Sequence, residues 1–341
     1  MKLSELLSRG RPTVSCELFP PKVGTTLDQV EGVLRDTAAL RPDFISVTYG
    51  AGGSTSKRTQ EIAVRLQDTY HVPALAHLTC VSSTREEISS MVAALRAAGI
   101  ENILALRGDI PRDADFPSPE HYHYASELIG HIRSLEGGKE LCIGAACYPE
   151  GHVECPHRED DIDFLKRKVD MGVDFLTTQM FFDNDVLYRF LYRVLAKGIT
   201  VPVIAGIMPV MSVKQIRRSC ELSGTVMPPR LQGIADRFGD DPAAMRQAGI
   251  AYATEQIVDL VAHPHLHDEQ ARCGGQDHGQ PLGYHPAPWL RSTGRRRAAT
   301  WGSTGAAVRW TRSWRPACGT ADGRSWPVPV PEASGGAFPW R

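Results

Sequence analysis

The chain has 341 residues, 42% of them hydrophobic, and a formal net charge of −1. This length is enough for one large domain or for two smaller ones, each with a buried core. A charge this close to zero gives no overall bias toward nucleic acid or an anionic membrane, and no apolar run is long enough to span a bilayer.

Seven short apolar runs alternate with stretches whose apolar residues recur at helical spacing. The predicted strands cover residues 13–19, 44–49, 74–79, 103–106, 142–148, 175–182 and 201–208. Helices are predicted over residues 26–40, 118–135, 160–171, 183–196, 229–238 and 242–262. Three more are predicted to begin near residue 56, near residue 83 and after residue 212.

Several helix ends carry recognisable signals. Ser83 with Glu86 three residues later forms a capping-box pattern, and Ser212 is a predicted N-cap. Gly172 and Gly198 each follow a helical pattern, where a glycine in the left-handed conformation commonly ends a helix.

The alternation of strand and helix predicts parallel strands joined by helical crossovers. Because no glycine-rich fingerprint follows the first strand, we expect an α/β fold of the (β/α)8 TIM-type barrel class rather than a doubly wound sheet. The eighth strand expected just after residue 262 is missing from the sequence pattern. We therefore predict a barrel domain over residues 1–262 and a tail over residues 263–341.

The tail has a different composition from the barrel. It holds ten arginines, no lysine, five acidic residues and all six tryptophans, and about a quarter of it is proline and glycine. Nothing in it has the periodicity of a core-forming element, so we predict a low-complexity, disordered segment.

Polar residues end several of the predicted strands. The run 103–106 stops abruptly at Arg107, Gly108 and Asp109, which in isolation indicates a solvated turn. Other strand ends carry similar groups, including Glu17 and His77. Because the carboxyl ends of barrel strands meet on one face, these side chains predict a ligand site there.

The cysteines indicate neither a disulfide framework nor a metal site. The chain has eight cysteines without a CxxC pair and begins without a signal-peptide-like apolar run, so we expect reduced thiols and a cytoplasmic location. Cys147, His152, Cys155 and His157 have spacings that match no usual zinc pattern, and no metal is expected.

Seven ordered motifs resemble the methylenetetrahydrofolate reductase family over residues 3–262. They are C-E-L-F-P-P-K at 16–22, S-V-T-Y-G-A at 46–51, A-H-L-T-C at 76–80, L-R-G-D at 106–109, A-C-Y-P-E-G-H at 146–152, L-K-R-K-V-D at 165–170 and T-Q-M-F-F-D at 178–183. The resemblance implies a barrel that holds FAD, uses NADH or NADPH, and reduces 5,10-methylenetetrahydrofolate to 5-methyltetrahydrofolate for methionine synthesis. It also implies a homo-oligomer with neither nucleic acid nor membrane as a partner.

The resemblance also implies residue roles. Glu17 matches the general acid that protonates the folate, Asp109 a carboxylate beside flavin and folate, and Gln179 a residue used by nicotinamide and folate. Thr48 matches a nicotinamide contact. The implied flavin contacts are Tyr49, Ala51, His77, Arg107, Gly108, Asp109, Ala125, Tyr148, His152, Asp161, Arg167 and Lys168.

The chain departs from the family pattern in two places. Val213 stands where the family has a stacking aromatic residue. The family closes its barrel with a strand similar to I-H-I-Y-T-M-N-K, whereas residues 263–271 read H-P-H-L-H-D-E-Q-A. If the codons of that segment are read one base later, they allow I-H-I-Y-T-M-N-K-P, and we therefore predict a frameshifted C-terminus. In the given sequence, Gln270 stands where the family has a basic residue for the folate tail.

Two alternatives to an active reductase follow. Without an eighth strand, the first and seventh strands keep unpaired edges, which favours a catalytically defective barrel of the same family. The third reading is a binding module whose basic tail, with Arg295, Arg296, Arg297 and the tryptophans, contacts nucleic acid.

Overall fold

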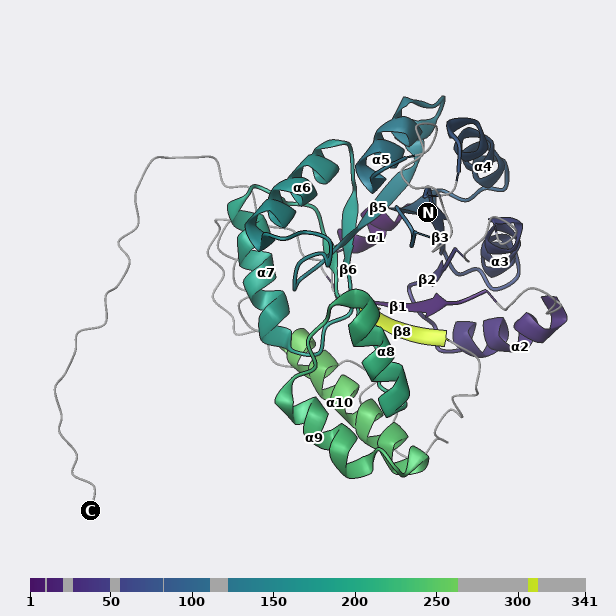
Figure 1. Ribbon diagram of the computed structural model, residues 1–341. Coiled ribbons are helices and arrows are strands. Elements are labelled where there is room, and N and C mark those ends of the chain that lie inside the picture. Colours follow the sequence, from purple (N-terminus) through teal and green to yellow (C-terminus); the bar gives the residue numbers. More distant parts are fainter. Residues whose placement is uncertain are drawn as a thin grey trace, which may run out of the picture.

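A computed structural model describes residues 1–9, 11–20, 27–49, 56–81, 83–110, 122–262 and 306–311. Its sheet has the strand order β7-β6-β5-β4-β3-β2-β1-β8. Figure 1 shows helices α2 to α7 in an arc around the strands, with α8, α9 and α10 grouped together below them. Among the described helices, none is long and apolar enough to cross a membrane.

Seven strands run parallel in chain order, as the alternating pattern predicts. They are β1 (Thr13–Leu18), β2 (Phe44–Val47), β3 (Ala74–Thr79), β4 (Asn102–Leu106), β5 (Cys142–Cys147), β6 (Phe175–Thr178) and β7 (Val203–Ile204). The sheet is curled like that of an α/β barrel, so the predicted fold class is confirmed.

The helices cover the outside of the sheet or extend beyond it (Figure 1). They are α1 (Leu3–Leu7), α2 (Leu27–Ala38), α3 (Ser56–Asp68), α4 (Arg85–Ala97), α5 (Ala125–Ser134), the 3-10 turn η1 (Gly138–Glu140), α6 (Arg158–Asp170), α7 (Asn184–Ala196), α8 (Val213–Ser223), α9 (Pro229–Phe238) and α10 (Pro242–Ala262).

The edge of β1 is occupied in an unexpected way. Within the described ranges no parallel eighth strand is present, but β8 (Ala306–Thr311) pairs antiparallel with β1, and Glu17 lies opposite Ala307. The prediction that β1 keeps an unpaired edge is therefore wrong. Because β8 comes from the tail and runs in the opposite direction, it is not the strand that completes a (β/α)8 barrel.

The predicted Ser212 cap and both glycine signals agree with the structure, whereas several other element ends differ. The side chain of Ser212 accepts from the backbone N–H of Gln215, and Gly172 and Gly198 adopt φ values of 106° and 70°. The capping box of α4 is formed by Thr84 and Glu87 rather than by Ser83 and Glu86, one residue later with the same spacing.

Residues 118–121 of the helix predicted over residues 118–135 lie outside the described ranges; in the described part the helix covers Ala125–Ser134, and Tyr124 before it is extended. Strands β6 and β7 are shorter than the predicted runs, since residues beyond Thr178 and Ile204 leave the sheet for the loops at its carboxyl end.

The two faces of the sheet are buried separately. The outward residues of the strands pack with helices α2 to α7 in the larger core cluster. The inward residues Phe44, Leu75, Leu104 and Phe175 pack with α1, whose three leucines are almost completely buried. This short helix was not predicted; it covers the amino end of the barrel and leaves the carboxyl end for a site.

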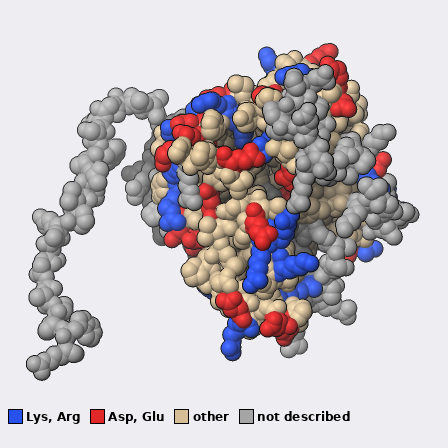
Figure 2. All heavy atoms as spheres, in the orientation of Figure 1, with Lys and Arg blue, Asp and Glu red and all other residues tan. Residues whose placement is uncertain are grey.

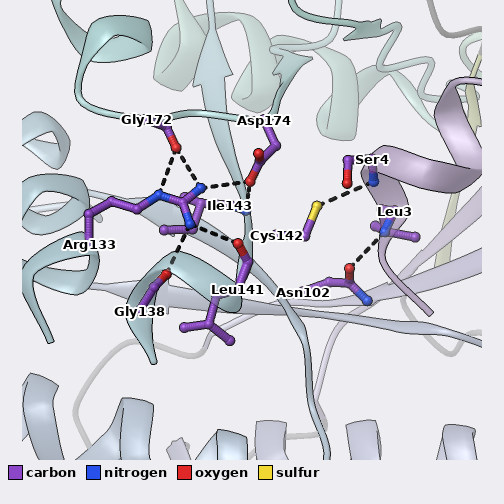
Figure 3. Close-up of polar contacts among 10 residues, drawn as sticks. All are labelled: Leu3, Ser4, Asn102, Arg133, Gly138, Leu141, Cys142, Ile143, Gly172 and Asp174. Atoms are coloured by element: carbon purple, nitrogen blue, oxygen red, sulfur yellow. Dashed lines mark hydrogen bonds and ion pairs between the residues drawn. The ribbon is translucent and has the colours of Figure 1, made fainter. Parts of the chain in front are cut away.

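Hydrogen bonds fix α1 in this position (Figure 3). The backbone N–H of Leu3 donates to Oδ1 of Asn102 at 2.8 Å, and that of Ser4 donates to Sγ of Cys142 at 3.3 Å. The amide of Asn102 also donates to the carbonyl of Ala74 at 3.2 Å. The helix is thus hydrogen-bonded to the first residues of β4 and β5, and Asn102 links it to the start of β3.

Arg133 joins α5 to the segments that lead into β5 and β6 (Figure 3). Its guanidinium donates to the carbonyls of Gly138, Leu141 and Gly172 and to the carboxylate of Asp174, at 2.6 to 2.9 Å. We expect Arg133→Ala to lower the free energy of unfolding by about 3 kcal/mol, because it removes five hydrogen bonds to four partly buried acceptors.

Urea denaturation measures this effect. Arg35→Ala is the matched control, since the side chain of Arg35 is 70% exposed and pairs with its neighbour Asp36; it should change stability by less than about 0.5 kcal/mol. Equal effects of the two substitutions would contradict the role assigned to Arg133.

Candidate functional site

A small cavity lies inside the curled sheet and is lined by residues of β1, β2, β3, β4, β6 and β7. Its polar lining comes from five strand residues, Ser15, Glu17, Ser46, His77 and Thr177. The remaining lining is apolar and consists of Phe44, Leu75, Leu104 and Ile204. The barrel interior therefore changes from apolar at the end covered by α1 to polar at the opposite end.

Strand alternation explains why Glu17 lies inside. Cys16 and Leu18 belong to the outer core cluster, so the residue between them faces inward. Glu17 is 4% exposed and His77 is 6% exposed, and both line the same cavity. A carboxyl group and an imidazole are thus shielded from bulk water in one small space, which is suitable for proton transfer to a bound ligand.

The carboxyl end of β4 carries Arg107, Gly108 and Asp109, as predicted. Gly108 has φ = 90°, and a Cβ there would lie 3.1 Å from Cβ of Thr79. Only glycine fits this combination of backbone conformation and space easily. Asp109 is exposed above the strand end and does not line the inner cavity.

The guanidinium of Arg107 is held by a carboxylate that the sequence analysis missed. Its two terminal nitrogens donate to the two oxygens of Glu154, both at 2.6 Å. This hydrogen-bonded pair keeps the pKa of Glu154 below its usual value. Glu154 lies only two residues beyond His152, and that proximity is the one signal in the sequence that could have identified it.

Tyr148 and His152 form a ring pair beside Arg107. Their centroids are 4.6 Å apart, with an interplanar angle of 86°. Burial raises the pKa of Tyr148 to about 12 and lowers that of His152, so both side chains are neutral near pH 7. Nδ1 of His152 accepts from the backbone N–H of Glu154 at 3.2 Å.

Asp161 and Lys168 on α6 complete this group. Nζ of Lys168 donates to the carbonyl of Ala146 at 2.9 Å. Burial lowers the pKa of Lys168 and raises that of Asp161, and the charge of Lys168 opposes the shift of Asp161. We call Arg107, Tyr148, His152, Asp161 and Lys168 the rim cluster; it brings two cationic side chains to the ends of β4 and β5.

The other predicted site residues lie on the same side of the sheet but make different contacts. Oε1 of Gln179 accepts from the backbone N–H of Met180, directly after β6. The carbonyl of Thr48 accepts from the hydroxyl of Thr59, and the hydroxyl of Tyr49 donates to Sδ of Met91 on α4. Tyr49 is thus turned toward a surrounding helix.

Ala125 and Arg167 are further implied flavin contacts outside the rim cluster, and Ala51 lies outside the described residues. Ala125 is the first residue of α5 and is half-buried. Arg167 is exposed, and its guanidinium lies 5.0 Å from the ring centroid of Phe164.

Val213 is the first residue of α8, and its replacement of a stacking aromatic residue of the family stays a prediction. It packs against a small core that joins α8, α9 and α10 and includes Phe182, Ile216 and Leu231. An aliphatic side chain at this position provides no flat face for stacking.

The described part of the chain contains no group of three or more His, Cys, Asp or Glu side chains arranged to hold a metal ion. Cys147 is buried in the outer core, and Sγ of Cys155 donates to the carbonyl of His157 at 3.1 Å.

Figure 2 shows acidic and basic side chains lying side by side over the viewed face.

A family model and similar curated proteins point to the same family. The model of the methylenetetrahydrofolate reductase family matches residues 2–268. Methylenetetrahydrofolate reductase (NADH) 1 of Arabidopsis thaliana is 34% identical over 273 residues, which cover 77% of this chain and 46% of that protein. The chain spans about half the length of the plant and yeast relatives that it matches.

A bacterial relative is shorter. 5,10-Methylenetetrahydrofolate reductase of Pectobacterium carotovorum is 31% identical over 255 residues, which cover 75% of this chain and 83% of that protein. A protein from Clostridium thermocellum, described as binding two copies of 5-methyl-5,6,7,8-tetrahydrofolic acid, has a similar fold, with a TM-score of 0.50 and 14% identity over 76% of this chain and 88% of that one. With matches of this extent, the chain belongs to the methylenetetrahydrofolate reductase family.

Proposed function

We propose that this chain is an FAD-dependent reductase that converts 5,10-methylenetetrahydrofolate to 5-methyltetrahydrofolate with NADH or NADPH as the electron source. The observation that carries the proposal is the placement of the buried acid Glu17 inside the barrel, with the rim cluster at the carboxyl ends of β4 and β5. Membership of the family, whose members are named for the reduction of methylenetetrahydrofolate, supports the same reaction.

The donor set fits a flavin dinucleotide. Arg107 and Lys168 provide cations for a diphosphate, and Asp161 provides an acceptor for ribose hydroxyls. Gly108 allows a close approach of the backbone, and the neutral Tyr148 and His152 provide partly buried ring surfaces. When bound, FAD would supply the hydride-transfer chemistry that links the reduced nicotinamide to the folate.

The roles proposed for the protein's own residues are those that the resemblance to the family implies. Glu17 protonates the folate from the water-shielded cavity, Asp109 and Gln179 contact flavin and substrate at the mouth, and Thr48 contacts the nicotinamide. The named plant relative uses NADH, so NADH is the first donor to test. We also propose that the protein acts in the cytoplasm as a homo-oligomer that feeds methionine synthesis.

A direct assay tests the proposal. The purified full chain, supplied with FAD, 5,10-methylenetetrahydrofolate and either NADH or NADPH, should form 5-methyltetrahydrofolate, which chromatography with mass detection identifies. Consumption of reduced nicotinamide without folate product would support the defective-barrel alternative. A folded chain that neither binds FAD nor oxidises either nicotinamide would contradict the proposal.

The nucleic-acid alternative has a separate test. Binding through the arginines of the tail would depend steeply on salt and would disappear on deletion of residues 263–341. The near-zero net charge and the mixed charges of the viewed surface favour the reductase instead (Figure 2).

A further inference from the structure

Both terminal nitrogens of Arg107, which we call its donor fork, bind the carboxylate of Glu154. Nη1 donates to Oε2 and Nη2 to Oε1, each at 2.6 Å. A guanidinium that binds two oxygens in parallel makes the same contact with a carboxylate as with a phosphate group. In this structure Glu154 therefore occupies the place on Arg107 that an anionic ligand would take.

The two partners differ in how firmly they are held. The side chain of Arg107 is 19% exposed, at the end of β4, whereas that of Glu154 is 53% exposed, in the loop between β5 and α6. Ion pairs with such an exposed partner contribute little free energy, because water solvates the carboxylate when the pair opens. Glu154 can thus leave Arg107 at low cost, while Arg107 stays at the site.

The groups around Arg107 determine how much positive charge an incoming anion meets there. Asp109 is the other carboxylate whose charge acts on Arg107, and Nζ of Lys168 donates to the carbonyl of Ala146 at the end of the neighbouring strand β5. With Glu154 in place, the guanidinium is already neutralised, and an incoming diphosphate meets less positive charge than the composition of the rim cluster indicates.

We propose that Glu154 is a positioning residue that occupies the fork of Arg107 in the cofactor-free chain and must be displaced when a diphosphate-bearing dinucleotide binds. This inference rests on the proposed function, since it assumes that Arg107 receives the diphosphate of FAD. Glu154 keeps Arg107 correctly oriented without a ligand, and the free energy needed to displace Glu154 lowers the affinity and the association rate for the dinucleotide.

Titration of FAD into the cofactor-free full chain, followed by flavin fluorescence, tests the proposal. For Glu154→Gln we expect a dissociation constant roughly fivefold lower than for the unchanged chain, the size expected from losing one half-exposed competing ion pair. The gain should lie mainly in the association rate. Glu154→Ala serves as a second variant, and circular dichroism checks that both remain folded.

Glu159→Gln is the matched control. It removes the same charge from an exposed position in the first turn of α6, where Glu159 lies 3.7 Å from Arg193. We expect it to change FAD affinity less than about twofold. Inorganic pyrophosphate should compete with FAD, and its own affinity should rise in Glu154→Gln but not in Glu159→Gln.

The outcomes separate the two proposals. If the unchanged chain binds FAD and Glu154→Gln binds it equally or more weakly, Glu154 is not a competitor and this inference is wrong, while the proposed function stands. If the unchanged chain and both Glu154 variants are folded but bind neither FAD nor pyrophosphate, both proposals fail.

Discussion

Glu17→Gln is expected to reduce the rate of folate reduction by roughly a hundred- to ten-thousandfold, the usual contribution of a general acid. Glutamine preserves the size of the side chain in a cavity where the residue is 4% exposed, but it carries no acidic proton for the folate. Reduction of the bound flavin by NADH needs no proton from this position, so its rate should stay within about threefold of the original.

Anaerobic stopped-flow spectroscopy measures the two half-reactions separately. Glu140→Gln is the control, because Glu140 is exposed beside Arg96 and lies at the amino end of β5, away from the cavity. It should leave both rates unchanged. Equal losses in the two half-reactions of Glu17→Gln would indicate a structural role, and an undiminished folate step would exclude Glu17 as the acid.

The second large effect is expected when residues 263–341 are replaced by the product of the alternative reading frame. That product begins with a segment similar to I-H-I-Y-T-M-N-K-P, which we predict to pair in parallel with β1 and β7. We expect the free energy of unfolding to rise by about 2–5 kcal/mol and the flavin content of the purified protein to increase.

The physical reason lies in the edges of the sheet. Strand β7 has two residues and pairs in parallel with β6, while β1, at the other end of the parallel series, pairs with the antiparallel β8. A parallel strand between them would satisfy both edges and enclose the cavity that contains Glu17. Urea denaturation and the visible flavin absorbance of both chains measure the change.

A chain ending at residue 262 is the control for this experiment. If β8 stabilises the sheet, this shortened chain should be less stable than the full chain, and the frame-corrected chain more stable than both. A frame-corrected chain no more stable than the full chain would contradict the reading-frame hypothesis. The nucleotide sequence after residue 262 provides an independent test.

Local patterns were sufficient to predict the parallel barrel-like sheet. The inward position of Glu17 follows from apolar residues on both sides of it in a strand, and the rim position of Arg107 follows from the abrupt end of an apolar run. Both inferences depend only on the period of a strand and on the convergence of parallel strand ends.

The features that were not predicted depend on contacts between distant residues. Arg107 and Glu154 are 47 positions apart, and β8 pairs with a strand almost 300 residues earlier. No local pattern specifies such pairings. At the start of α4, Ser83 and Thr84 each have a glutamate three residues later, so two overlapping capping boxes were equally compatible with the sequence.

A crystal structure of the chain grown with FAD tests the central claim most directly. We predict that the dinucleotide lies at the carboxyl ends of the strands, with its diphosphate on Arg107, Glu154 moved away, and the flavin ring over the cavity that contains Glu17. Flavin bound at another surface, with the Arg107–Glu154 pair intact, would contradict the account.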